Sequence, residues 1–123
     1  MNVTYKTHTP MDAIAELVSR LGREAVTRPP ADVPHLGRRP GAVVRPTSSE
    51  EVVELVRWAR EHRVALVPSG GRTGLSGGAD AHEGEVILSL EKMNRILDFN
   101  RADRTVRCQA GVVTQLVQEF VRD

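Results

Sequence analysis

The sequence predicts a mixed α+β fold that begins with a strand–helix–strand unit. Two short apolar runs, Ala42–Arg45 and Val64–Val67, flank a segment with helical periodicity. Units of this kind cross over with a right hand and give parallel strands. A glycine-rich stretch then follows the second strand, at the carboxyl edge where open α/β sheets bind ligands. The order of these features therefore predicts both the fold class and the place of a ligand site.

Composition excludes several classes of protein. The chain has 123 residues, enough for one small domain with a single core. A net charge of +1 and an aromatic content of 3% argue against a nucleic-acid surface, and the single cysteine excludes an internal disulfide. No apolar run approaches the roughly 20 residues of a membrane span, and Met1–Pro10 lacks the apolar core of a signal peptide. We expect a cytoplasmic location, with peripheral membrane association left open.

Residues 1–41 are expected to form an N-terminal helix and a proline-rich lead-in. Thr9 is placed to cap the helix, with Pro10 in its first turn and Asp12 completing a Thr-x-x-Asp pattern. Four apolar residues follow at helical spacing: Ile14, Leu17, Val18 and Leu21. Gly22 can end the helix. From Arg23 to Gly41, four prolines and the lack of periodicity predict an irregular connector.

The second predicted helix starts just after Pro46, which stops the first strand of the β–α–β unit. Thr47 and Ser48 each precede a glutamate by three residues, so two capping-box registers are open. The residues at helical spacing that should form its apolar face are Val52, Leu55, Val56 and Ala59. Trp58 is expected to lie toward one side of this face.

Beyond the glycine-rich stretch, the pattern predicts a strand, a hairpin and a helix. Glu85–Leu90 reads as a third strand, and residues 96–99 and 105–110 read as hairpin strands around a polar turn. Alternation turns Val106, Cys108 and Ala110 inward, which makes Cys108 a core residue rather than a reactive thiol. Residues 112–121 read as a helix whose apolar face comprises Val113, Leu116, Val117 and Phe120.

The glycine-rich stretch, Pro68–Gly78, is the main functional signal. It holds five of the chain's ten glycines, one arginine and three hydroxyl residues. Consecutive N–H groups in such a loop can converge on an anion. A lysine phosphate loop is excluded because no lysine lies between Lys6 and Lys92, and the dinucleotide fingerprint fails because a strand follows the loop. A nest that binds phosphate remains, beside the alternative of a turn without a ligand.

Four blocks in order resemble FAD-linked oxidases of the vanillyl-alcohol-oxidase type. Pro68–Gly78 resembles the pyrophosphate loop of that family, and Val44–Val52 resembles its first strand and helix start. Leu88–Leu97 and Cys108–Val112 resemble the two segments that follow. The resemblance leans toward the branch of D-2-hydroxyglutarate and D-lactate dehydrogenases and glycolate oxidase subunits. It implies that residues 42–123 form the first part of a PCMH-type FAD-binding domain, the first subdomain only.

The resemblance also implies the cofactor and its contacts. FAD would be held by Pro68, Ser69, Gly70, Gly71, Arg72, Thr73, Gly74, Leu75, Gly77, Gly78 and Gly111. Arg72 stands where relatives with covalently attached FAD often carry histidine, so the attachment should be non-covalent. Gly111 has a second interpretation, as a simple strand-to-helix break. His8, His35, His62 and His82 lack metal-ligand spacing, and we assign no metal ligand and no catalytic residue.

The implied function is that of the FAD-binding portion of a flavin-dependent oxidoreductase. In the family, a D-2-hydroxy acid such as D-2-hydroxyglutarate, D-lactate or glycolate is oxidised to the 2-oxo acid by hydride transfer to FAD. The family's second subdomain, substrate cap and catalytic residues have no counterpart here. The expected partner is therefore the downstream portion of the same enzyme or a complementary chain. A stand-alone nucleotide- or phosphate-binding module and an inactive fragment are the alternatives.

Overall fold

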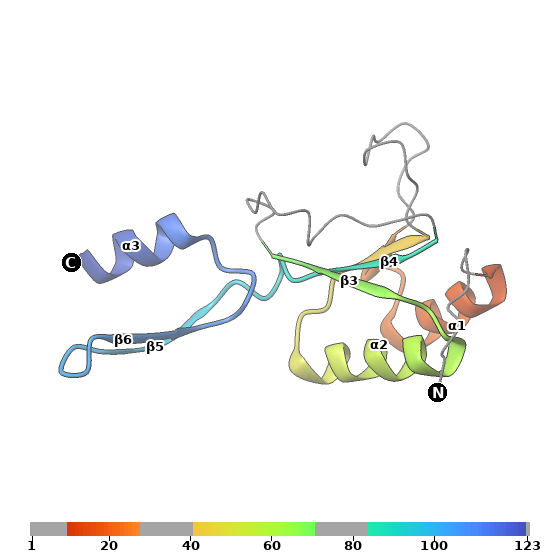
Figure 1. Ribbon diagram of the computed structural model, residues 1–123, viewed down its shortest axis with the longest axis horizontal. Helices are drawn as coiled ribbons and strands as arrows, with labels where there is room; N and C mark the ends of the chain where they lie inside the picture. Colours follow the sequence, from red (N-terminus) through yellow and green to blue (C-terminus); the bar gives the residue numbers. More distant parts are fainter. Residues whose placement is uncertain (1–9, 28–40, 71–83, 123) are drawn as a thin grey trace.

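The structure is a computed structural model that describes residues 10–27, 41–70 and 84–122. It has the predicted mixture of helices and strands (Figure 1). The elements in chain order are α1 (Met11–Leu21), β1 (Val26–Thr27), β2 (Ala42–Val44), α2 (Ser49–His62), β3 (Leu66–Ser69), β4 (Val86–Ser89), β5 (Ile96–Asn100), β6 (Thr105–Cys108) and α3 (Thr114–Arg122).

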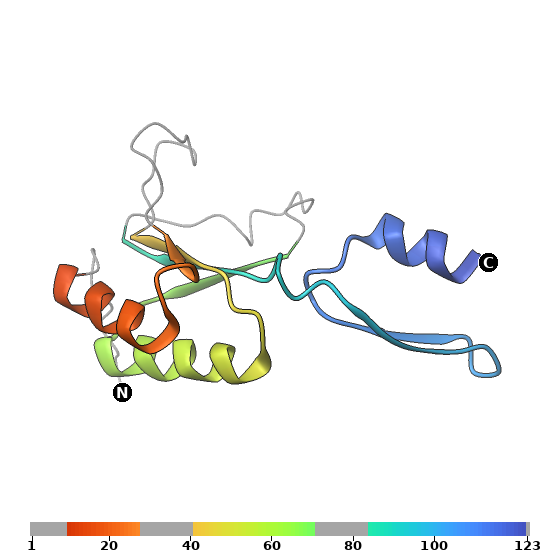
Figure 2. The same ribbon diagram turned by 180° about the vertical axis from the view of Figure 1, so that it is seen from behind.

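The central sheet has the strand order β1-β2-β4-β3. Both β2 and β3 run parallel to β4, which lies between them, so the predicted parallel unit is confirmed although its two strands are not neighbours. At the far edge β1 pairs antiparallel with β2, with Val26 opposite Val44. The prediction of an irregular connector from residue 23 was wrong here. Helices α1 and α2 lie on the same face of the sheet (Figures 1 and 2).

The core lies between this sheet and the two helices. Leu17, Leu55 and Trp58 are fully buried, and the Trp58 indole N–H donates to the Ala13 carbonyl oxygen at 2.8 Å. Trp58 is therefore central rather than lateral, whereas Val56 is 48% exposed, contrary to prediction. The reason is that α1 packs against α2 on the Trp58 side, which turns the Val56 side toward solvent.

The helix ends show which of the predicted caps form. Ser48 is the cap of α2: its hydroxyl accepts from the Glu51 N–H at 3.2 Å, while the Glu51 carboxylate accepts from the Thr47 N–H at 2.8 Å. At α1 the cap position belongs to Pro10, so the helix begins one residue later than predicted and has no side-chain cap. The proposed capping role of Thr9 lies outside the described residues. Gly22 ends α1 as predicted.

Strand β3 lies two residues further along the chain than predicted, so Pro68 is inside it. The Val86 N–H of β4 donates to the Ala65 carbonyl oxygen at 3.0 Å. The Leu90 N–H, just after β4, donates to the Ser69 carbonyl oxygen at 2.8 Å. Alternation along a parallel ladder then turns the Pro68 nitrogen away from β4. Its missing N–H costs no ladder bond, and it leaves the outer edge of β3 with one donor fewer.

The hairpin β5–β6 and α3 extend away from this body (Figures 1 and 2). Two hydrogen bonds close the turn between the strands. The Asn100 side-chain amide donates to the Asp103 carboxylate, and the Asp103 N–H donates to the Asn100 side-chain oxygen. The predicted inward packing was wrong for this hairpin: Val106 and Ala110 are exposed and Cys108 is half-buried. The edge-on contact between Phe99 and Phe120 holds α3 near the hairpin, but a groove remains beside it.

Candidate functional site

The site suggested by the sequence lies at the carboxyl edge of the central sheet. Because β2, β3 and β4 are parallel, all three end at this edge. Pro68, Ser69 and Gly70 are the described residues at the end of β3. The remaining predicted contacts of the loop, Gly71, Arg72, Thr73, Gly74, Leu75, Gly77 and Gly78, lie outside the described residues.

Ser69 carries an unsatisfied polar atom at this edge. Its residue is only 2% exposed, and its side-chain oxygen has no hydrogen-bond partner among the described residues. Leaving a buried hydroxyl unpaired costs about 1–3 kcal/mol. A hydroxyl can donate and accept, so this atom fits a phosphate or sugar oxygen of a ligand. The donor chemistry at the entrance to the loop is thus compatible with a nucleotide.

The fold brings Gly70 next to the turn that precedes α3. A Cβ atom added to Gly70 would lie 3.3 Å from the Ala110 carbonyl oxygen. Gly70 therefore lies beside the turn that contains Gly111, although the two residues are far apart in the sequence. Two of the predicted cofactor contacts are brought together in this way.

Gly111 makes a close backbone approach within the protein itself. Its N–H donates to the Met93 carbonyl oxygen at 2.9 Å, and an added Cβ atom would lie 1.7 Å from the Leu90 carbonyl oxygen. No real Cβ atom tolerates such a contact, so the position requires glycine irrespective of any ligand. The predicted close approach is present, and its partner is the turn after β4. A role for Gly111 in holding a cofactor stays a prediction.

One of the cationic side chains at this edge is already paired within the protein. Arg45, directly after β2, forms an ion pair with Glu91 and donates to the Thr27 hydroxyl at 2.7 Å. This arrangement ties β1, β2 and the turn after β4 together. Because its guanidinium is engaged in this way, Arg45 is poorly placed to neutralise a phosphate. The other cation that the sequence analysis placed here is Arg72.

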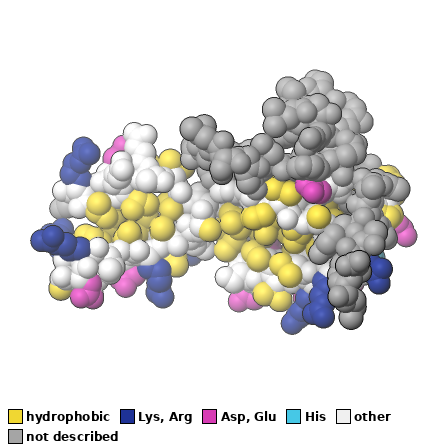
Figure 3. All heavy atoms as spheres, viewed as in Figure 1, with side chains coloured by type: hydrophobic (Ala, Val, Ile, Leu, Met, Phe, Trp, Pro, Cys, Tyr) yellow, Lys and Arg dark blue, Asp and Glu magenta, His cyan; other side chains and the backbone are white. Residues whose placement is uncertain are grey.

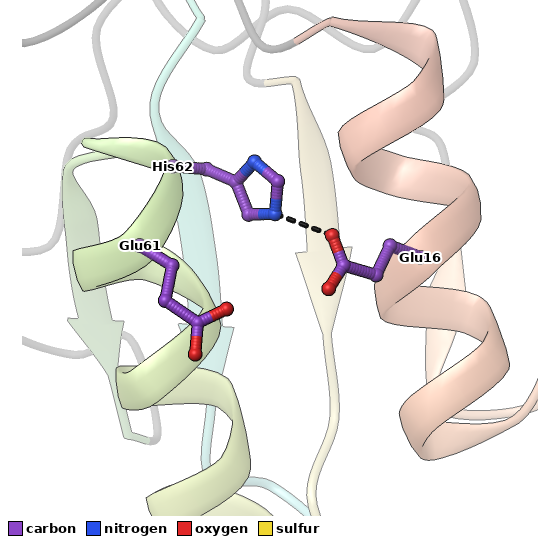
Figure 4. Close-up of side chains that lie close together, drawn as sticks. All are labelled: Glu16, Glu61 and His62. Carbon is purple, nitrogen blue, oxygen red and sulfur yellow. Dashed lines mark hydrogen bonds and ion pairs between the residues drawn. The ribbon is translucent and has the colours of Figure 1, made fainter.

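A second polar cluster lies between the two helices α1 and α2 (Figure 4). Glu16 of α1 and Glu61 and His62 of α2 have ligand atoms within 4.8 Å of one another, and the His62 ring lies 2.5 Å from the Glu16 carboxylate. Arg20 contacts both carboxylates at 2.7 Å. Sequence spacing missed this cluster because helix packing, and not a local motif, brings its members together.

Arg20 neutralises the two carboxylates of this cluster through its ion pairs with Glu16 and Glu61. The hydrogen bonds from His62 and then Arg20 lower the pKa of Glu16. The hydrogen bonds that Arg20 donates to Glu61 and, second, to Glu16 raise the pKa of Arg20. Both shifts favour the charged forms, so the cluster is a clasp between α1 and α2.

Within the described ranges, no helix is both long enough and apolar enough to cross a membrane. The cytoplasmic location stays a prediction.

Comparison with known proteins relates most of this chain to one family. The FAD binding domain family matches residues 40–123. A D-2-hydroxyglutarate dehydrogenase of Stutzerimonas stutzeri (strain A1501) is 56% identical over 89 residues, which are 72% of this chain and 19% of the relative. A D-lactate dehydrogenase of Anaerostipes hadrus is 44% identical over 75 residues, 61% of this chain and 16% of the relative. The chain thus spans less than a fifth of the length of these relatives.

Solved structures show the same fold. The crystal structure of p-cresol methylhydroxylase with substrate bound superimposes with a TM-score of 0.81 at 24% identity. The match covers 98% of this chain and 26% of that protein. At this level of identity the likeness concerns the fold, and it places the strands and helices described above in the PCMH-type architecture.

Proposed function

This chain belongs to the FAD binding domain family, and we propose that it holds the FAD pyrophosphate in a D-2-hydroxy-acid dehydrogenase. The family match confirms an FAD-binding domain, and the structural likeness confirms the PCMH-type fold. The oxidoreductase activity of the whole protein is part of the proposal. The substrate, the contact residues and the limits of the domain at residues 42–123 belong to the proposal. The match from residue 40 onward supports those limits.

The observation that carries the proposal is the unpaired Ser69 hydroxyl beside Gly70. A buried polar atom without a protein partner is able to bind a ligand oxygen. It lies at the carboxyl edge of parallel strands, where ligands bind sheets of this kind. The glycine loop starts from the same point.

In the proposed complex, Pro68, Ser69 and Gly70 begin the cradle and the loop from Gly71 to Gly78 continues it. Backbone N–H groups would surround the pyrophosphate, and the Arg72 side chain would supply positive charge. Because arginine forms no covalent bond to the flavin, the attachment would be non-covalent. Bound FAD would supply the hydride acceptor for oxidation of the substrate carbon that carries the hydroxyl group. The residues of this chain bind and orient the cofactor.

D-2-hydroxyglutarate is the substrate we favour for the whole protein. The relative named for that activity is 56% identical, compared with 44% for the D-lactate dehydrogenase. Glycolate is the third candidate that the sequence analysis left open. Turnover would also need segments equivalent to the rest of the relatives' chains, supplied by the downstream portion of the same enzyme or by a complementary chain. The alternative of a stand-alone nucleotide-binding module predicts binding without turnover.

Flavin titration tests the cofactor site. FAD added to the purified chain should lose fluorescence on binding, and ADP should compete because it retains the pyrophosphate, whereas riboflavin should not. The double variant Gly71→Val/Gly74→Val should abolish binding. Ala102→Val, which adds bulk at the exposed hairpin turn, is the matched control and should bind FAD normally. Unchanged FAD binding by the double variant would show that the loop assignment is wrong.

A complementation assay tests the substrate. The chain is mixed with the remainder of the Stutzerimonas relative, and dye reduction is followed with D-2-hydroxyglutarate, D-lactate and glycolate. We expect the fastest reduction with D-2-hydroxyglutarate. Binding of FAD without reduction of the dye by any of the three acids would favour the stand-alone module. The absence of both would favour an inactive fragment.

A further inference from the structure

Two short segments connect the central sheet with the β5–β6 hairpin and α3. Residues 90–95 lead from β4 into the hairpin and residues 109–112 lead from the hairpin to α3; together they form the joint. Figure 3 shows apolar side chains gathered over the hairpin and α3 and also over the sheet. The joint lies beside Gly70, because the Ala110 carbonyl oxygen is the atom that an added Cβ would meet there. The bonds that hold the joint therefore bear on the sheet edge proposed to hold FAD.

Gln109 and Arg95 extend the hairpin by one pair beyond Ile96 and Cys108, where the ladder ends. The Gln109 N–H donates to the Arg95 carbonyl oxygen at 2.8 Å. In a regular antiparallel pair the Arg95 N–H would donate back to the Gln109 carbonyl oxygen. Here it donates to the Gln109 side-chain oxygen at 3.0 Å. The side chain of Gln109 thus takes the place of its own backbone carbonyl as the acceptor.

This exchange of acceptors leaves the Gln109 carbonyl oxygen available for a turn. It accepts from the Val112 N–H at 3.2 Å, which closes the turn that leads into α3. Within that turn the Gly111 N–H donates to the Met93 carbonyl oxygen at 2.9 Å, in the other segment of the joint. A carbonyl aligned with the ladder would point across to Arg95 and not along the chain to Val112. Regular pairing and this turn are therefore alternatives.

The place of the turn is closely defined by its neighbours. Gly111 is buried, and an added Cβ atom would lie 1.7 Å from the Leu90 carbonyl oxygen. On its other side the turn approaches Gly70 through the Ala110 carbonyl oxygen. Opening the turn would break the bond between Gly111 and Met93 and would also shift the backbone that lies against Gly70.

We propose that Gln109 is a positioning residue of the cofactor site. Its side-chain oxygen accepts from the Arg95 N–H, keeps the turn at Gly111 closed and so holds the joint beside Gly70. The link to FAD rests on the proposed function, whereas the closing of the turn concerns the protein alone. Glutamate offers an acceptor at the same reach, methionine keeps the length with only a weak acceptor, and asparagine is one methylene shorter.

Amide hydrogen exchange of the full chain without flavin, followed by NMR, tests the hold on the turn. In Gln109→Met the Arg95 and Gly111 amides should exchange about fivefold faster, because one hydrogen bond is lost. Gln109→Asn should behave in the same way, and Gln109→Glu should retain the original rates. Gln115→Met makes the same change at an exposed position of α3 and is the matched control. Faster exchange at Arg95 alone would overturn the proposal, since water would then replace the side chain without effect on the turn.

FAD titration of the same variants tests the link to the site. Gln109→Met should raise the dissociation constant of FAD about fivefold relative to Gln115→Met. The urea midpoint of Trp58 emission should stay unchanged, because Trp58 lies in the core between the sheet and the helices. Equal FAD affinities of the two variants would refute the positioning role. If the unmodified chain binds no FAD, the proposed function fails, and the exchange rates alone then decide whether Gln109 closes the turn. Circular dichroism establishes that each variant is folded.

Discussion

The two parts of this molecule use similar sequence patterns and reach different degrees of burial. In the body, which comprises α1, α2 and the central sheet, Leu17, Leu55 and Trp58 are fully buried. In the arm, which comprises β5, β6 and α3, Leu116 is 54% exposed and Phe120 is 50% exposed. Both parts contain helices with a clear apolar side. Periodicity therefore predicts the helix, whereas burial depends on what packs against it.

The largest expected difference between body and arm is the cost of removing an aromatic side chain. Trp58→Ala should destabilise the protein by about 3–5 kcal/mol, because it leaves a cavity in the core. Phe120→Ala should cost about 1 kcal/mol or less, because the residue is already 50% exposed. Urea unfolding followed by far-ultraviolet circular dichroism measures both.

Trp58→Phe provides the control for this pair. It keeps most of the ring volume and removes the bond to the Ala13 carbonyl oxygen, so it should cost about 1–2 kcal/mol. Equal costs for the alanine variants of Trp58 and Phe120 would contradict the distinction between body and arm.

The next effect concerns the joint between the two parts. Gly111→Ala should destabilise the chain by about 2–3 kcal/mol, because the new Cβ atom collides with the Leu90 backbone and forces the turns apart. Gly70→Ala meets the Ala110 oxygen at 3.3 Å and should cost less than about 1 kcal/mol. Thermal unfolding of the two variants provides the comparison, and similar midpoints would argue against the close backbone contact at Gly111.

A smaller effect is expected at the start of α2. Ser48→Ala removes the hydroxyl that accepts from the Glu51 N–H and should cost about 1 kcal/mol. Ser49→Ala, one exposed residue later, is the matched control and should be nearly neutral. In the arm, Thr114→Ala at the first residue of α3 should leave the urea midpoint of the body unchanged. A shift of that midpoint would mean that body and arm unfold together.

The smallest effect is a pH dependence confined to the body. Because the pKa of Glu16 is lowered from 4.5 in the folded state, its contribution to stability is complete above pH 4.5. That contribution is lost as the pH falls from there through the folded-state pKa. Glu16→Gln should flatten the decline of the urea midpoint in this range. Glu119→Gln in α3 is the control, because it leaves the clasp intact. An identical flattening of the decline in this variant would refute the assignment of the pH dependence to Glu16.

The elements of this fold were largely predictable, and the exceptions have local physical causes. The parallel unit, the hairpin and all three helices follow from periodicity and from turn residues. Strand β1 was missed because two residues pair with β2 and carry no pattern of their own. The exposed side of α2 was misassigned because the choice between Val56 and Trp58 depends on where α1 packs.

The candidate site was predictable to a different extent. The glycine stretch identified the sheet edge, and the lack of any lysine between Lys6 and Lys92 excluded the lysine loop. The unpaired state of the Ser69 hydroxyl and the meeting of Gly70 with the turn at Gly111 depend on tertiary packing. The clasp of Glu16, Arg20 and His62 likewise joins two helices, so spacing along the chain carries no trace of it.

The central position of Trp58 has a consequence for spectroscopy. It is the only tryptophan in the sequence, and its ring is enclosed between α1, α2 and the sheet. Indole emission therefore reports the solvent access of the body and is silent about β5, β6 and α3. A single sigmoidal emission curve would look like two-state unfolding even if the arm had already melted. Only a second probe placed in the arm, such as a fluorophore on Cys108, would show whether the two transitions coincide.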